Sequence, residues 1–133
     1  MRQGIAFLFF LTCFLGVMAA GGASHPKKAR NPQSELAQAP VAAHSWKNPF
    51  EGRPEAVQAG KLLYDRHCAQ CHGADGKGHG KAPNLHVPPV QSAAAGTLFW
   101  FLKNGNLKEG MPAWSRLPDQ QLWQMVSYLQ TLR

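Results

Sequence analysis

The stretch Cys68-Ala69-Gln70-Cys71-His72 lies near the middle of this 133-residue chain and decides how the rest of it is interpreted. Two cysteines separated by two residues, with a histidine directly after the second, form the attachment pattern for c-type haem. The thiols are spaced to form thioethers with the two vinyl groups of one porphyrin edge, and the adjacent imidazole can then ligate the iron. The sequence therefore predicts one haem c, covalently bound through Cys68 and Cys71, with His72 as a metal ligand.

Three other chemistries remain open for the cysteine pair. A thioredoxin-like dithiol usually follows a strand, and no strand pattern precedes Cys68. A disulfide across two residues would close a strained loop. A zinc site could recruit His79 and His86, but the six residues between these histidines exceed the usual spacing of roughly three to five. Haem attachment explains the pattern best, because it alone requires a histidine directly after the second cysteine.

The N-terminus has the three parts of a secretory signal peptide. A positive start, Met1-Arg2-Gln3, precedes an apolar run over 4–18 and a cluster of small residues over 19–23. We predict a signal peptide over 1–23, with an uncleaved membrane anchor as the alternative. Cleavage would also remove Cys13, so that the two motif cysteines would be the only ones left. Export agrees with haem c, because its attachment takes place outside the cytoplasm.

Between the signal and the compact part, residues 24–50 are rich in Ala, Pro, Ser, His and Lys. This composition predicts a flexible arm that is extended at its prolines. Trp46, Pro49 and Phe50 near its end either fold back onto the domain or remain exposed. We expect one compact domain over 51–133.

Helical spacing and chain breakers predict an all-α domain with three to four short helices and long loops. One helix should open at Pro54 and run to Cys68. Glycines and prolines over 73–92 exclude a long helix or a central strand there. Thr97 can cap a helix that ends at Asn104-Gly105. A last helix should open at Pro118-Asp119, because apolar residues form one stripe after it.

The composition excludes several classes of protein. The chain is 44% hydrophobic and contains seven Phe, four Trp and two Tyr, which need a folded core. Only the N-terminal run is long and apolar enough to span a bilayer. The formal net charge is +7, but the basic residues are scattered, so no nucleic-acid partner is predicted. A domain this small often needs a cofactor, metal or disulfide to fold stably.

The segment from about residue 54 to 132 resembles a class I single-haem bacterial cytochrome c domain. It is most similar to the small haem domains that serve as oxidase subunits or as acceptors for dehydrogenases. The motifs occur in the same order as in that family. They lie at residues 59–64, 68–78, 82–85, 110–114 and 122–129.

The resemblance implies roles for individual residues. Met111 would be the distal ligand, 111 − 72 = 39 residues after His72. The Pro83 carbonyl would accept a hydrogen bond from Nδ1 of His72 and orient its ring. The apolar side chains expected against the haem are Leu85, Phe99, Trp100 and Trp114.

Other residues could compete for these roles. Met125 lies on the apolar stripe of the last helix, so core packing is its expected role. His86, in a proline-rich loop, stays an open alternative for the distal ligand, whereas His79 is too near His72 in sequence. Gly60 would let the first helix of the domain cross the last one closely, against Tyr128.

With His72 and Met111 on the iron, no position is open for an external ligand, so the resemblance implies a one-electron carrier and not an enzyme. The carrier would be periplasmic, or tethered to the inner membrane if the N-terminal segment is retained. Its partners would be redox proteins such as a dehydrogenase, a quinol–cytochrome c reductase or a terminal oxidase, and it could be a subunit of a larger oxidoreductase. The alternative is a haem enzyme or gas sensor with a labile Met111.

Overall fold

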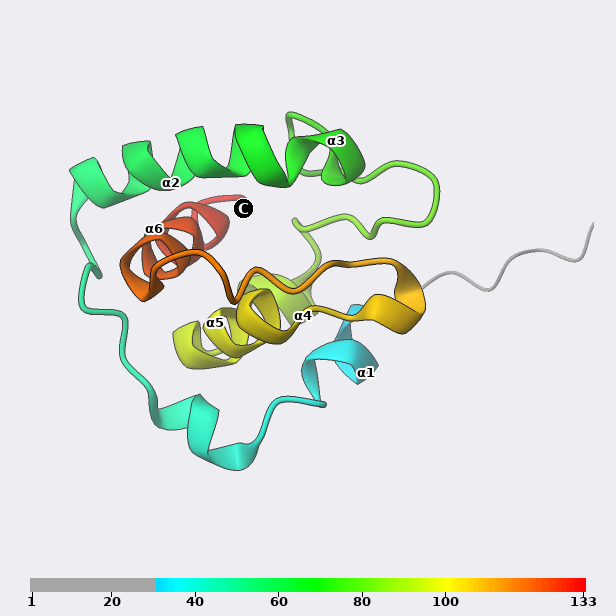
Figure 1. Cartoon of the computed structure of the whole chain (residues 1–133), viewed down its shortest axis with the longest axis horizontal. Coiled ribbons are helices and arrows are strands. Elements are labelled where there is room, and N and C mark those ends of the chain that lie inside the picture. The colour runs from blue at the N-terminus through cyan, green and yellow to red at the C-terminus, as the bar shows by residue number, and fades with distance from the viewer. Residues whose placement is uncertain (1–30) are drawn as a thin grey trace, which may run out of the picture.

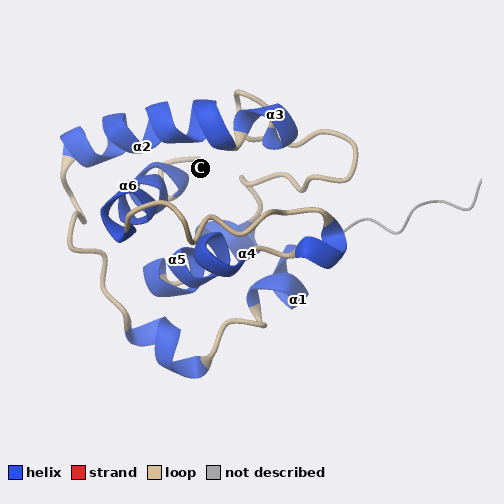
Figure 2. Cartoon of the chain, in the orientation of Figure 1, coloured by secondary structure: helices blue, strands red, loops and turns tan. Residues whose placement is uncertain are grey.

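The computed structural model describes residues 31–133. This part of the chain forms six α-helices and two 3-10 helices joined by loops, with no strand (Figure 2). The elements are α1 (Pro32–Leu36), η1 (Val41–Ser45), α2 (Pro54–His67), α3 (Ala69–His72), α4 (Pro88–Gln91), α5 (Ala95–Asn104), η2 (Leu107–Glu109) and α6 (Asp119–Leu129). The predicted all-α fold is confirmed. The signal peptide predicted over 1–23 lies outside the described residues.

Helices α2 and α6 form the main packing pair, and they cross closely at Gly60 (Figure 1). A Cβ atom on Gly60 would lie only 2.0 Å from the carbonyl oxygen of Gln124 and 2.9 Å from Cβ of Tyr128. Only a residue without a side chain permits this approach. The contact agrees with the close crossing that the resemblance implies, and it brings the end of α2, where the cysteine motif begins, against the core.

The core lies between α2, α5 and α6. Its most deeply buried large side chains are Tyr64, Leu122, Met125 and Val126. The stripe predicted for the last helix supplies most of this cluster, since α6 turns its apolar face inward. Met125 is 1% exposed and packs in this core, as its spacing predicts.

Helix α5 begins earlier than the sequence indicates. We predict a cap at Thr97, but α5 starts at Ala95 and Thr97 is buried within its first turn. The first turn also makes a close contact at Gly96, where a Cβ atom would lie 2.0 Å from the carbonyl oxygen of Ala43. The backbone of η1 thus rests directly on the first turn of α5.

Residues 31–50, which lie within the predicted flexible arm, form α1 and η1 and pack against the helices (Figure 1). The Trp46 ring meets Phe99 edge-on, with ring centroids 6.1 Å apart, and Phe99 stacks on Trp123 at 4.1 Å. Asn48 donates from Nδ2 to the carbonyl of Trp123 and to Oγ of Ser127, at 3.1 and 2.9 Å. Trp46 therefore folds back onto the domain. Residues 24–30 lie outside the part that the structure describes.

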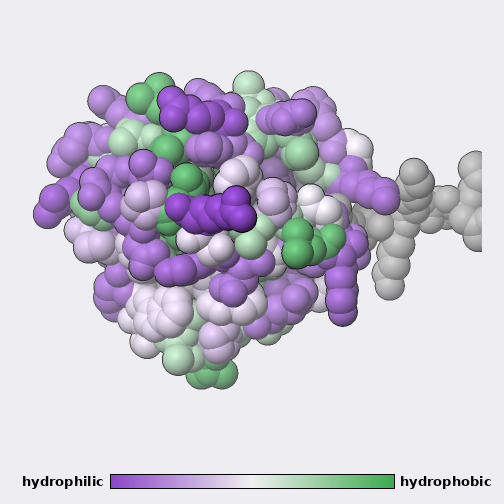
Figure 3. Space-filling view, in the orientation of Figure 1, coloured by the Kyte–Doolittle hydropathy of each residue, from purple (hydrophilic) through white to green (hydrophobic). Residues whose placement is uncertain are grey.

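The surface is mostly polar in the view of Figure 3, with small and separate apolar patches. The large apolar side chains most exposed in residues 31–133 are spread over different elements: Val41 on η1, Leu62 on α2 and Leu107 on η2. Within the same range, no helix has the length and apolar character needed to cross a bilayer.

Candidate functional site

A cavity of about 530 Å³ lies between α3, α5 and the segment around Met111. Its volume is within the range typical of cofactor pockets. Most of the lining is apolar, and the polar part includes four residues from or near the cysteine motif. These are Cys68, Gln70, Cys71 and His72.

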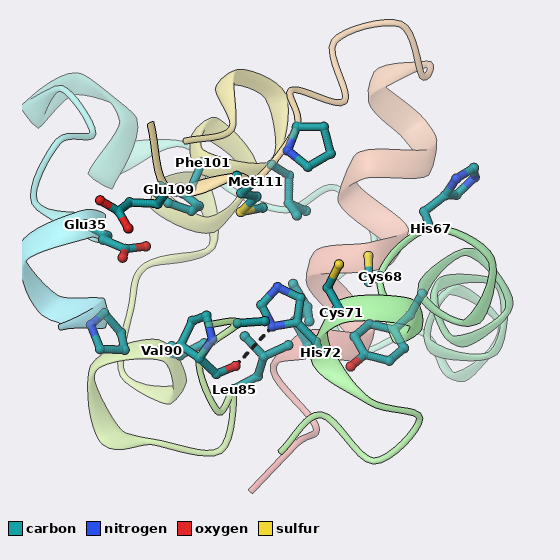
Figure 4. A pocket seen from close by; sticks show the side chains of 18 of the residues that line it. Glu35, His67, Cys68, Cys71, His72, Leu85, Val90, Phe101, Glu109 and Met111 are labelled. Carbon is teal, nitrogen blue, oxygen red and sulfur yellow. Dashed lines mark hydrogen bonds between the residues drawn. The ribbon is translucent and has the colours of Figure 1, made fainter. Parts of the chain in front are cut away.

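One helical turn brings the motif to the cavity. The amide groups of Cys71 and His72 both donate to the carbonyl of Cys68, at 3.1 and 2.9 Å. This turn places both sulfur atoms on the same side of the space between His72 and Met111 (Figure 4). Both thiols are free, and burial raises the pKa of Cys68 to about 12. The pair is thus presented as two separate thiols facing one cavity.

A hydrogen bond to the backbone orients the imidazole of His72. Its Nδ1 lies 3.0 Å from the carbonyl oxygen of Pro83, so the ring donates a hydrogen bond there and turns its other nitrogen toward the cavity (Figure 4). Pro83 is in place because the loop folds tightly at Gly78, where a Cβ would meet the backbone of Ala82 and Pro83. The amide of Gly78 also donates to the carbonyl of His72 at 2.7 Å.

Met111 approaches from the other side of the cavity, across from His72 (Figure 4). Its backbone pairs with Asn106 through two hydrogen bonds, of 2.9 and 3.0 Å, that close a short loop around η2. Beyond Met111, the amide of Trp114 donates to the carbonyl of Leu102 at 3.0 Å. The bonds to Asn106 hold the backbone of Met111 itself, and the bond to Leu102 fixes the following residues against α5.

The structure brings together most of the predicted site residues, with two exceptions, both on α5. Leu85, Pro83 and Trp114 line the same cavity as the motif. Trp100 does not, although the sequence predicts it on the wall. On α5 the residues that face the cavity are spaced by three and four, as one side of a helix requires. They are Leu98, Phe101 and Leu102. Phe99 also lies elsewhere, between Trp46 and Trp123.

The histidines outside the motif take different positions. His67 lines the cavity and packs on Trp114, with ring centroids 4.9 Å apart. His79 also lines the cavity. His86 turns away to Asp75, and its Nε2 lies 2.6 Å from the Asp75 carbonyl oxygen. Within residues 31–133, no three His, Cys, Asp or Glu side chains gather as a metal-binding group.

Sequence reasoning missed the contribution of α1 to the site. Pro32, Glu35 and Leu36 line the cavity. The signal was the pair Asn31-Pro32, because asparagine favours the N-cap and proline the first helical position. In the structure, Oδ1 of Asn31 accepts a hydrogen bond from the amide of Gln33 at 3.1 Å.

The residues around the cavity suit a haem c. Two free thiols face one side, an imidazole braced at Nδ1 and a thioether face each other, and the remaining wall is largely apolar. A haem with two axial ligands needs an apolar site with one donor on each face of the ring. The chemistry of this donor set therefore agrees with the cofactor that the motif predicts.

Comparison with known proteins supports this assignment. The sequence model of the family described as "Cytochrome C oxidase, cbb3-type, subunit III" matches residues 55–129. Cytochrome c550 of Pseudomonas aeruginosa is 32% identical over 94 residues, which cover 65% of this chain and 63% of that protein. The cbb3-type cytochrome c oxidase subunit FixP of Rhizobium meliloti is 36% identical over 84 residues, covering 60% of this chain and 29% of that protein.

A third relative is the quinohemoprotein alcohol dehydrogenase ADH-IIG of Pseudomonas putida, 32% identical over 77 residues, which cover 56% of this chain and 10% of that protein. The chain thus spans less than two thirds of the length of each of these relatives. The crystal structure of cytochrome CL from Methylophaga aminisulfidivorans shares the fold, with a TM-score of 0.57 and 18% identity, over 82% of this chain and 71% of that chain. The family match, together with the all-α fold, shows that the chain belongs to the cbb3-type subunit III family of cytochrome c domains, which are class I c-type cytochromes.

Proposed function

We propose that this protein is a periplasmic one-electron carrier that binds one haem c through Cys68 and Cys71, with His72 and Met111 as axial ligands. One observation carries the proposal: all four side chains line the same apolar cavity, with His72 and Met111 on opposite sides of it (Figure 4). Bound there, haem supplies a couple between Fe(III) and Fe(II) that exchanges one electron.

The chain's own residues would set the properties of that couple. The hydrogen bond from Nδ1 of His72 to Pro83 fixes the tautomer and orientation of the imidazole, which keeps Nε2 available as the donor atom. A neutral imidazole and a soft thioether together favour the ferrous state and raise the reduction potential. The apolar wall acts in the same direction, because it solvates the extra charge of the ferric state poorly.

A carrier is favoured over a haem enzyme or gas sensor by the way Met111 is held. An enzyme or sensor would need Met111 to leave its position and open a site for an external ligand. The paired hydrogen bonds to Asn106 restrain the backbone at Met111, and the bond from Trp114 to Leu102 restrains the segment that follows it. This restraint supports a closed site, in which the chemistry is limited to electron exchange.

The partners we propose are redox proteins that donate or accept one electron. The relatives' names include an oxidase subunit and an alcohol dehydrogenase, so a dehydrogenase, a quinol–cytochrome c reductase and a terminal oxidase are the classes to examine. Fast exchange with such partners suits small and weak interfaces. We also propose that the chain is exported, on the basis of the signal pattern over 1–23.

The test is an optical spectrum of the reduced protein, exported from a host that can attach haem c, before and after carbon monoxide is added. A low-spin haem c spectrum that does not change with carbon monoxide is the expected result. The band should survive denaturation, because the attachment is covalent. A prompt change with carbon monoxide would favour the enzyme or sensor. Absence of a haem band would contradict the proposed cofactor.

A further inference from the structure

The described chain N-terminal to the family match contributes to the candidate haem cavity. The family match begins at residue 55, yet Pro32, Glu35 and Leu36 of α1 line the cavity together with the motif. We refer to residues 31–50 as the N-terminal strap. The inference below rests on the proposed function, since it concerns the haem that this cavity would hold.

The strap is joined to the helices along its whole length. At its start, Leu36 packs against the buried core cluster, and α1 lies against α4 and α5. In the middle, Ala43 is fully buried where η1 rests on Gly96. Burial at these successive points gives α1 a defined position over the cavity.

The far end of the strap is fixed by a buried polar contact. Asn48 is 6% exposed, and its Nδ2 bonds both the Trp123 carbonyl and Oγ of Ser127 on α6. Its Oδ1 accepts from the amide of Phe50 at 2.9 Å. An asparagine buried in this way would leave unpaired polar atoms if the strap moved, so displacement of the strap is costly.

Helix α1 lies at the end of the cavity that is remote from the cysteines. In Figure 4, Glu35 lies at the end of the cavity remote from the sulfur atoms of Cys68 and Cys71, and Glu109 lies at that same end. A haem attached at the cysteines would therefore have its opposite edge toward α1. Glu35 is half-buried, which reduces the screening of its charge by solvent.

We propose that the N-terminal strap is an additional wall of the haem site. We place Glu35 at the haem edge remote from the cysteines, where its negative charge shifts the reduction potential. Leu36 excludes water from that edge, which disfavours the ferric state and raises the reduction potential. The carboxylate of Glu35 acts in the opposite direction, because a nearby negative charge stabilises the ferric iron. Two neighbouring residues of one short helix thus shift the same equilibrium in opposite directions.

The charge effect is tested with the full-length, haem-loaded protein by redox titration followed optically. Glu35→Gln should shift the midpoint potential upward, and the shift should shrink in high salt, which screens a charge that is still partly exposed. Glu51→Gln is the matched control. It makes the same change of net charge at an exposed residue that does not line the cavity, and it should give a clearly smaller shift.

The packing effect is tested with Leu36→Ala, which opens the remote edge to water without changing charge. The midpoint potential should shift downward, and amide exchange over 33–36 should become faster. Gln38→Ala is the control, because Gln38 is exposed and does not line the cavity. It should leave the potential unchanged.

Shifts of opposite sign for Glu35→Gln and Leu36→Ala, each larger than its control, would support the inference. A normal haem spectrum with shifts equal to those of the controls would overturn the inference and leave the proposed function intact. A wild-type protein without a haem band would overturn both.

Discussion

The hydroxyl of Tyr64 donates a hydrogen bond to the carbonyl oxygen of Gly73, at 2.6 Å, and so ties the end of α2 to the residue directly after His72. Tyr64 is 1% exposed and its ring packs on Tyr128, with centroids 5.1 Å apart. Gly73 has a φ of +78°, a conformation that other residues rarely adopt. The contact therefore fixes the turn by which the chain leaves the cysteine motif.

We predict that Tyr64→Phe destabilises the protein by about 0.5–1.5 kcal/mol, the net value of one hydrogen bond. The buried Gly73 carbonyl loses the hydroxyl donor and keeps only the bond from the amide of Gly76, at 3.2 Å, while the ring packing is retained. Denaturant unfolding of the haem-loaded protein measures this change. Haem attachment should be unaffected, since the thiols and His72 remain. The substitution Gln58→Ala, at an exposed position of α2, is the control. Equal stability of the two variants would contradict a stabilising role for the hydroxyl.

The same tyrosine predicts a loss of stability at high pH. Burial raises the pKa of Tyr64 above its ordinary value of 10.0, so the folded state favours the neutral phenol. The contribution of Tyr64 to the free energy of unfolding is therefore fully present below pH 10 and declines as the pH rises above that value. The decline should be at most about 1.4 kcal/mol per pH unit.

Unfolding free energies measured between about pH 9 and pH 11 in the wild type and in Tyr64→Phe test this prediction. The wild type should lose stability more steeply than the variant over this range. Parallel curves would show that other groups, such as lysines, account for the alkaline slope.

Met111→Ala should open the distal side of the haem. Without the thioether, carbon monoxide should bind the ferrous protein promptly, and the reduction potential should fall, because the ligand that favours Fe(II) is gone. Optical titration in the presence and absence of carbon monoxide measures both effects. Met125→Leu is the matched control, since Met125 is buried in the core and does not line the cavity. If Met125→Leu opened the site and Met111→Ala did not, the ligand assignment would be wrong.

The two tryptophans predicted on the cavity wall should behave differently. Trp114 lines the cavity and packs on His67, so Trp114→Leu should admit water and lower the reduction potential. Trp100 lies on another side of α5, so Trp100→Leu should leave the potential unchanged. A shift of similar size in both variants would contradict the positions that the structure gives them.

Sequence patterns predicted α2 and α6 well because local signals mark them. Pro54 begins α2 and Asp119 begins α6. Within each helix, apolar residues recur at helical spacing. The cavity-facing side of α5 was harder to predict, since Leu98 to Leu102 are apolar on every side of the helix. No polar face indicates which of these residues points inward. Phe99 and Trp100 were therefore misplaced. Leu98, Phe101 and Leu102 were missed.

The packing of the N-terminal strap was predicted only as one of two alternatives, for Trp46, Pro49 and Phe50, because it depends on distant residues. Asn48 bonds residues that are 75 and 79 positions away. The sequence around Gly96 does not indicate that the backbone of η1 packs directly on this glycine. Such contacts between remote segments leave little trace in the local composition, which for residues 24–50 is that of a linker.

The strap also has a consequence for the order of events during biogenesis. It is synthesised before α4, α5 and α6, against which it packs. Until those helices arrive, the edge of the cavity that α1 covers stays open. A haem that reached the cysteine motif during that interval would meet an open entrance, and docking of the strap would then close it.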